Sequence, residues 1–260
     1  MQDGEKTKEQ LINELEQIRK QIAALKTSYQ DLENQLEGQT EELANVNEAR
    51  AVELVKSKKL QQEFKNGCGK LQRVLTETIS ALSFAVEKPY TEGHQDRVAK
   101  LACAIAAGMN FSEDAILGVK IAAIIHDIGK INIPAEILSK PSKLTKIEYS
   151  MITLHPQAGY EIIKNIEFPW PVSKAILQHH EKMDGTGYPQ GLTGDEIIVE
   201  ARILGVADVV EAMTAPRPHR PALGIEKALG EILEKKGICY DAQIVDACVR
   251  LFKEEGFKLN

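Results

Sequence analysis

Histidine is scarce in this sequence, and five of its six copies stand in short segments suited to binding a metal. Neutral imidazoles and carboxylates are the ligands that a pair of transition-metal ions requires. The candidate ligands are His94, His126, Asp127, His155, His179, His180 and Asp208. Only His219 stands outside this set. So few histidines have little reason to gather in this way by chance, and the set predicts a dinuclear metal site.

The spacing of these residues predicts how helices bring them together. Successive histidine segments are about 24–32 residues apart, which at 1.5 Å rise suits a helical hairpin better than one helix. Each candidate can then reach one place from a different helix of a bundle. His126 and Asp127 are adjacent, so they can share a site only near a helix end or if one residue bridges two ions. Pro156 disfavours helical geometry at His155, and the glycine-rich loop after His180 ends another helix.

Residues 5–66 are predicted to form a coiled-coil helix. Two interleaved series of apolar residues recur with seven-residue spacing, the pattern of a coiled-coil seam. They are Leu11, Ile18, Leu25, Leu32 and Val46, and Leu15, Ile22, Tyr29, Leu36 and Leu43. Beyond Val46, Arg50, Glu53 and Ser57 occupy the seam, and a phase shift of the stutter type is expected there. Such a polar helix needs a partner. A parallel homodimer is favoured, with an antiparallel pair or packing on the rest of the protein as alternatives.

Residues 70–255 are predicted to form an all-helical domain, because apolar residues recur three and four apart and no sustained two-residue alternation is found. Ser112, followed by acidic residues, is an expected N-cap, and Thr145 with Glu148 an expected capping box. The two glycines in residues 66–70 predict a hinge or a frayed helix end, since each costs ~1 kcal/mol inside a helix. The predicted fold class is therefore an all-α bundle preceded by a long coiled-coil helix.

Composition excludes several classes of protein. The net charge of −6 argues against a binder of nucleic acid polymers, which would carry a basic stripe. No apolar run approaches the ~18–20 residues that span a bilayer, and the polar first residues predict no secretory signal. The four cysteines have neither metal-binding spacing nor a dense disulfide pattern. A cytoplasmic protein is expected.

Taken together, these motifs resemble those of the HD-GYP domain, a branch of the HD superfamily of metal-dependent phosphohydrolases. The resemblance covers about residues 70–255. It rests on HxxRV (94–98), HDIGK (126–130), HP (155–156), HHEKMDGTGYP (179–189) and VAD (206–208). It implies a helical HD-type fold and a phosphodiesterase that hydrolyses cyclic di-GMP to pGpG at a dinuclear metal centre, with further cleavage to GMP as an open alternative.

The resemblance also implies how the ligands divide between two metal ions. The quartet shared by HD proteins corresponds to His94, His126, Asp127 and Asp208, and the second ion's set is completed by His155, His179 and His180. Asp127 would bridge the ions. Iron or manganese is favoured, with cobalt or nickel as alternatives. Tyr90 stands where some members carry a glutamate for a third ion, so a third ion is not expected.

Catalytic and substrate-binding roles follow from the same resemblance. Asp127 and Lys130 are the implied catalytic residues, with Lys130 beside the scissile phosphate. The implied substrate contacts are Lys130, Tyr188, Arg217 and Arg220. The sequence departs from the family pattern at Glu211, in place of an aspartate outside the expected ligand set, and at His219, in place of a tyrosine.

Two alternatives stay open at this point. An HD-GYP-like domain with slow or no catalysis could sense the nucleotide and signal to a partner through the coiled coil. A hydrolase could also act on another cyclic dinucleotide, such as cyclic GMP-AMP, because residues that distinguish the bases cannot be picked from the sequence.

Overall fold

The computed structural model describes residues 7–86, 93–217 and 220–259. These residues form helices, turns and three isolated β-bridges, and no strand is found among them. The all-α fold class is therefore confirmed. The chain divides into two compact units, Met1–Leu71 and Gln72–Asn260, which are described separately below.

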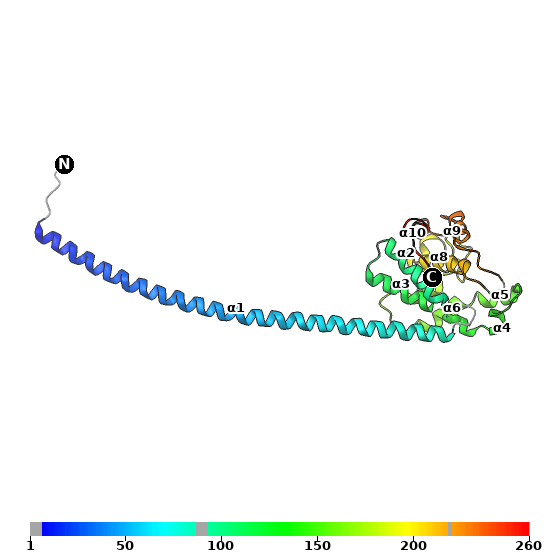
Figure 1. The fold of residues 1–260 in the computed structure, drawn as a ribbon, viewed down its shortest axis with the longest axis horizontal. Helices are drawn as coiled ribbons and strands as arrows, with labels where there is room; N and C mark the ends of the chain where they lie inside the picture. Colours follow the sequence, from blue (N-terminus) through cyan, green and yellow to red (C-terminus); the bar gives the residue numbers. More distant parts are fainter. Residues whose placement is uncertain (1–6, 87–92, 218–219, 260) are drawn as a thin grey trace, which may run out of the picture. The chain divides into compact units, whose positions relative to one another are not determined.

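Helix α1 (Lys8–Val86) is one uninterrupted helix (Figure 1). Of the two alternatives for residues 66–70, the frayed helix end is wrong, because both glycines of that segment are helical and exposed, and the hinge stays a prediction. A Cβ atom added at Gly67 or Gly69 would meet no atom within 4 Å. Apolar residues at helical spacing continue on both sides, with Phe64 before the glycines and Leu71 after them. This continuing pattern outweighs the ~1 kcal/mol that each glycine costs.

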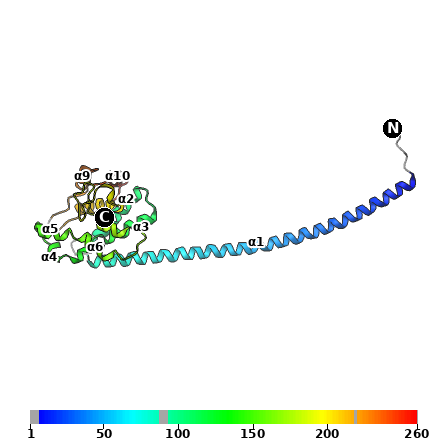
Figure 2. The ribbon, with the colours of Figure 1, turned by 180° about the vertical axis from the view of Figure 1, so that it is seen from behind.

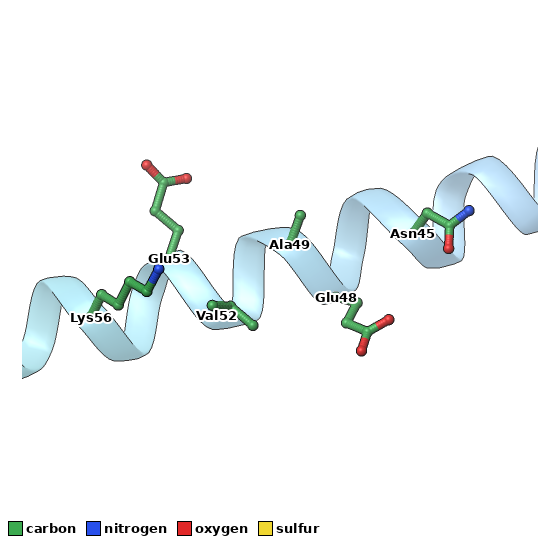
Figure 3. A pocket seen from close by; sticks show the side chains of 6 residues that line it. All are labelled: Asn45, Glu48, Ala49, Val52, Glu53 and Lys56. Atoms are coloured by element: carbon green, nitrogen blue, oxygen red, sulfur yellow. The ribbon is translucent and has the colours of Figure 1, made fainter.

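The apolar residues of both seam series are at least half exposed on α1, as Leu25 (69%) and Leu32 (66%) illustrate. Figure 3 shows another part of α1, where a hollow is lined by residues of this helix alone and by none of the apolar residues of the two series. The lining residues are Asn45, Glu48, Ala49, Val52, Glu53 and Lys56. Among the described residues, α1 thus leaves a long apolar stripe uncovered. Neither α1 nor any other helix within the described ranges is long and apolar enough to cross a membrane.

The second unit is a bundle of shorter helices (Figures 1 and 2). In chain order they are α2 (His94–Gly108), α3 (Glu113–Ile125), the 3-10 helix η2 (Ile128–Asn132), α4 (Ala135–Leu138), α5 (Lys146–Ile152), α6 (His155–Ile163), α7 (Val172–Gln178), the 3-10 helix η3 (Gly194–Glu196), α8 (Val199–Thr214), α9 (Ile225–Glu234) and α10 (Ala242–Lys253).

Helix α2 packs against α3, α8 and α10, and α7 packs against α3, α6 and α8. Their facing side chains form one apolar core, in which Leu101, Ile105, Ile176, Leu204 and Ile244 are fully buried. Burying a side chain of this size stabilises the fold by about 1.5–3 kcal/mol. The core therefore fixes the helix ends that carry the candidate ligands.

Two helix starts follow the sequence prediction. The Ser112 hydroxyl accepts the Ala115 N–H at 3.2 Å and caps α3. The Thr145 and Glu148 side chains form a capping box at the start of α5. Both predicted caps are confirmed.

Candidate metal centre

All seven candidate ligands lie in one place within the bundle. His94 begins α2, His126 and Asp127 follow α3, His155 begins α6, His179 and His180 follow α7, and Asp208 lies within α8. The predicted origin from several different helices is confirmed, and each of the five candidate histidines stands at a helix end. Ring centroids of neighbouring histidines are 4.1 to 5.4 Å apart. The bundle thus gathers five imidazoles and two carboxylates.

The ligand atoms form two end groups joined by a third. One end group is His94, His126 and Asp208, and the other is His155, His179 and His180. The third is His126, Asp127 and His179, and the ligand atoms of each group lie within 4.8 Å of one another. Asp127 Oδ2 lies 3.5 Å from His126 Nε2 and 3.7 Å from His94 Nε2. Asp127 Oδ1 lies 3.3 Å from His155 Nε2. The two oxygens of one carboxylate therefore face different groups, which is the arrangement of a bridging ligand.

Three of the histidines are oriented by backbone carbonyls at the ends of helices α3, α5 and α7. Nδ1 of His126, His155 and His179 bonds to the carbonyl oxygen three residues earlier, at 2.7, 2.8 and 2.6 Å. A carbonyl only accepts, so the proton is on Nδ1 and the lone pair of Nε2 is left for a metal ion. His126 Nε2 is buried and has no hydrogen-bond partner within the described residues. A cation would satisfy that atom, so the residues present fit the metal centre that the motifs imply.

The imidazoles are held in the neutral form. Burial lowers the pKa of His126, and it lowers the pKa of His179 and His180 well below the usual value. Neighbouring histidines add to the effect at His179 and His180. A neutral imidazole is the form that coordinates a metal ion.

The two carboxylates are held in the charged form. Burial opposes ionisation of Asp127, but Lys130 and His126 outweigh it and keep its pKa well below the usual value. Burial likewise opposes ionisation of Asp208, and the neighbouring His94 and His126 lower its pKa nevertheless. Anionic carboxylates beside neutral imidazoles make the complete donor set for divalent transition metals.

Lys130 lies at the edge of this centre. It belongs to η2, and its Nζ donates to Asp127 Oδ2 at 2.5 Å. The Lys130 side chain is 26% exposed, whereas that of Asp127 is 9% exposed. The ammonium therefore stands between the bridging carboxylate and solvent, where an incoming anion would meet it.

Tyr188 borders the centre on the loop after α7. Its ring centroid is 4.8 Å from that of His180. The loop is held by Glu181, whose carboxylate accepts the N–H of Gln190 at 2.7 Å and of Leu192 at 3.0 Å. Tyr188 is thus fixed beside one of the candidate ligands.

Arg217 and Arg220 lie on the segment after α8 and bond to each other through their backbones. Their guanidinium groups bind the protein itself in this structure. Arg217 Nη2 lies 3.4 Å from Glu211 Oε2, and Arg220 Nη2 donates to the Ala212 carbonyl at 2.6 Å. Their role as substrate contacts stays a prediction. Tyr90 and His219, where the sequence departs from the family pattern, lie outside the described residues.

Sequence reasoning missed the contacts of Glu211. Its carboxylate is fully buried, accepts a hydrogen bond from His94 Nδ1, and accepts two from Arg97 at 2.8 and 2.7 Å. Burial opposes ionisation of Glu211, but these partners lower its pKa. The available signal was the pair of three-residue spacings, from His94 to Arg97 and from Asp208 to Glu211, which place each pair on one helix face.

The comparisons with known proteins agree with this geometry. The model of the HD domain family matches residues 77–244. Over 67% of its length the chain is 38% identical to the cyclic di-GMP phosphodiesterase response regulator RpfG of Xanthomonas campestris pv. campestris, covering 47% of that protein. It is 38% identical over 63% of its length to a cyclic di-GMP phosphodiesterase of Thermotoga maritima, covering 45% of it. It is 37% identical over 60% of its length to 3'3'-cGAMP-specific phosphodiesterase 3 of Vibrio cholerae, covering 34% of it.

Solved structures show the same fold. Bd1817, an HDG"Y"P protein from Bdellovibrio bacteriovorus, aligns with a TM-score of 0.54 at 19% identity, over 71% of this chain and 61% of that one. A cyclic GMP-AMP-specific phosphodiesterase of V. cholerae aligns with a TM-score of 0.53 at 18% identity, over 69% and 49%. The chain spans less than half of the curated relatives named above. The chain belongs to the HD domain family and is related to the HD-GYP cyclic di-GMP phosphodiesterases.

Proposed function

We propose that this chain hydrolyses a cyclic dinucleotide, cyclic di-GMP in the first place, at two transition-metal ions. The observation that carries the proposal is the position of Asp127, whose two oxygens face the imidazoles of the two end groups. A site of that kind fits two ions close together, the arrangement with which many phosphodiester-cleaving enzymes stabilise the attacking and leaving oxygens. The relatives in Xanthomonas and Thermotoga carry names that state this activity.

In this proposal each ligand group holds one ion, and Asp127 is shared. The first ion is held by His94, His126 and Asp208, and the second by His155, His179 and His180. Imidazole and carboxylate ligands suit iron and manganese, and also cobalt and nickel. When bound, two such ions supply a hydroxide nucleophile at neutral pH and neutralise charge on the phosphate.

The chain's own residues then orient the phosphodiester. Lys130 Nζ, on a side chain that is about one quarter exposed and beside Asp127, binds a non-bridging phosphate oxygen and donates a proton to the departing 3′ oxygen. Water adds to phosphorus as the bond to that 3′ oxygen breaks, which gives the linear product pGpG. The Tyr188 ring offers a flat surface next to His180 for the nucleotide. Arg217 and Arg220 bind the other phosphate, and Arg217 exchanges its contact with Glu211 to do so.

A second candidate substrate is cyclic GMP-AMP. It is favoured by the relative in V. cholerae, whose name states specificity for 3'3'-cGAMP and which is 37% identical over 157 residues. Both substrates present the same phosphodiester, so the metal centre serves either one. The base-contacting residues decide between them.

The test begins with the chain purified without air, followed by elemental analysis and a turnover assay with both cyclic dinucleotides. We expect two ions per chain and faster hydrolysis of cyclic di-GMP. Asp127→Ala should retain its helical content while turnover falls by more than the ~100-fold that loss of an outer-shell partner costs. Undiminished turnover in that variant, or a metal-loaded protein that binds the nucleotide without cleaving it, would overturn the proposal; the second outcome would identify a sensor.

We also propose that the chain is a cytoplasmic homodimer joined through α1. The uncovered apolar stripe on α1 supports the dimer, because an exposed seam of this length is stable only against another helix. The four cysteines, all within the described residues, are unpaired, as expected in a reducing compartment.

A further inference from the structure

The Nδ1 of His94 bonds to a side chain, whereas the Nδ1 of three other candidate ligands bonds to a backbone carbonyl. Those three are His126, His155 and His179, and each carbonyl belongs to the residue three positions earlier. His94 is the first residue of α2, as His155 is of α6, but the carbonyl that bonds to His155 comes from Ile152 at the end of α5. The acceptor at His94 Nδ1 is instead a side chain on α8.

Glu211 is that acceptor. It lies one helical turn after Asp208 on α8, is 0% exposed, and accepts the hydrogen bond from His94 Nδ1. A carboxylate has no proton to donate, so the Nδ1 of His94 carries the proton and Nε2 carries the lone pair. Nε2 lies 3.3 Å from Asp208 Oδ1 and 3.7 Å from Asp127 Oδ2. The imidazole is thereby turned toward the carboxylates of the first ligand group.

The negative charge of Glu211 also affects metal binding at the start of α2. The start of α2 carries the positive end of a helix dipole, which repels a cation at His94. A buried carboxylate behind the imidazole offsets that field, as a neutral carbonyl could not, and favours a cation at Nε2. Arg97 holds the carboxylate in position through Nε and Nη2, at 2.8 and 2.7 Å from Oε1.

We propose that Glu211 is a positioning residue that fixes His94 as an Nε2 ligand of the ion bound with His126 and Asp208. The inference rests on the proposed metal centre. It predicts a selective effect, because Glu211 contacts one ligand group, whereas Nδ1 of His155 and His179 in the other group bonds to backbone carbonyls. Loss of the Glu211 carboxylate should lower the affinity for one ion and leave the affinity for the other unchanged.

The experiment titrates metal-free protein with Mn²⁺ in the absence of air and measures both dissociation constants. Glu211→Gln should weaken one of the two sites by about 10–100-fold, the usual cost of losing an outer-shell partner, with the other unchanged. Glu211→Asp keeps the charge and should recover part of the lost affinity. The matched control is Asp241→Asn, which removes a carboxylate bound to Arg202 at 3.1 Å and should alter neither constant.

Two further results separate the possible explanations. Arg97→Met removes the guanidinium but keeps the bond between His94 and Glu211, so it should weaken Mn²⁺ binding less than Glu211→Gln does. If Arg97→Met and Glu211→Gln change the Mn²⁺ affinity and the melting temperature equally, the role of Glu211 is to hold Arg97 in place, and the inference is overturned. Unchanged Mn²⁺ affinities in Glu211→Gln would overturn it as well. If Glu211→Gln does not fold, the comparison of Glu211→Asp with the wild type decides. A wild-type chain without two Mn²⁺ sites would instead overturn the proposed function.

Discussion

A Cβ atom on Gly129 would lie 2.0 Å from the carbonyl oxygen of His155, so these two residues pack backbone against backbone. The contact joins η2 to α6. It lies two residues after Asp127 and one before Lys130. The bridging carboxylate and the lysine are therefore held against the helix that begins with His155 only because residue 129 has no side chain.

Gly129→Ala is therefore expected to destabilise the domain by about 1–3 kcal/mol, the usual cost of overpacking. Urea unfolding measures the change in free energy. The matched control is Gly230→Ala in α9, where an added Cβ meets nothing within 4 Å. That variant should be stabilised by about 0.5–1 kcal/mol, because alanine favours the helix. Equal stability of Gly129→Ala and the wild type would contradict the close packing.

The buried imidazoles predict how the stability of metal-free protein depends on pH. Burial holds the pKa of His126, His179 and His180 below their usual 6.5. Below about pH 6.5 the unfolded chain takes up protons that the folded chain does not, so the free energy of unfolding falls as pH falls. Asp127 and Asp208, with pKa values below 3.8, act in the same direction at lower pH.

The measurement is the urea midpoint of chelator-treated protein at about pH 8, 6.5 and 5, which brackets the ordinary titration of histidine. The midpoint should be nearly constant above pH 6.5 and decline below it. His179→Gln removes one of the three groups and should make the decline shallower. A midpoint that stays level or rises between pH 6.5 and 5 would show that these imidazoles are protonated in the folded state.

Lys130→Met tests whether this ammonium acts on the substrate or only balances the charge of Asp127. If it acts on the substrate, turnover should fall by about 10²–10⁴-fold, the range for loss of a general acid, while both ions remain bound. Lys140→Met is the control, because Lys140 binds Glu148 at 2.7 Å on a neighbouring segment, and it should leave turnover unchanged. If Lys130→Met loses bound metal in the same proportion as activity, Lys130 acts only by balancing the charge of Asp127.

Much of the site could be read from local sequence because the ligands stand at marked helix ends. Pro156 fixes the start of α6 beside His155, and the glycine-rich loop ends α7 at His179. The contact of Glu211 with His94 was not readable in that way. It depends on α8 packing against the start of α2, and 117 positions separate the two residues. The predicted coiled-coil helix stops at residue 66, whereas α1 continues to Val86. The prediction relied on the two glycines and left out the apolar residues that follow them at helical spacing.

The stutter expected beyond Val46 stays a prediction, and the spacing of later apolar residues also fits a seam that keeps its phase through the polar interruption. Leu60 stands two heptads after Val46, and Phe64 stands three heptads after Leu43. In that phase, Arg50, Glu53 (Figure 3) and Ser57 occupy seam positions, away from the middle of the stripe. Their positions help to decide whether the two helices of the proposed dimer run parallel or antiparallel.

In an antiparallel pair in which the seam residues 11–64 overlap fully, Arg50 and Glu53 would face Leu25 and Ile22 of the second helix, which leaves charges unpaired against apolar side chains. A parallel pair in register places Arg50 one turn from Glu53 of the partner subunit, so opposite charges meet. The parallel dimer is therefore expected, and a cysteine near one end of the seam can test it. Ile18→Cys, with the exposed Cys68 changed to serine, brings two thiols face to face only when the helices are parallel.

Under mild oxidation this variant should form a disulfide-linked dimer almost completely. In that antiparallel pair position 18 lies opposite residue 57 of the second helix, so the same thiols would be about 60 Å apart at 1.5 Å per residue, and no such product could form. The matched control is Glu16→Cys, on the outer face of the helix, which should cross-link poorly. Light scattering gives the mass independently. A dimer by mass in which Ile18→Cys fails to cross-link would establish the antiparallel arrangement, and a monomer by mass would show that the apolar stripe has another partner.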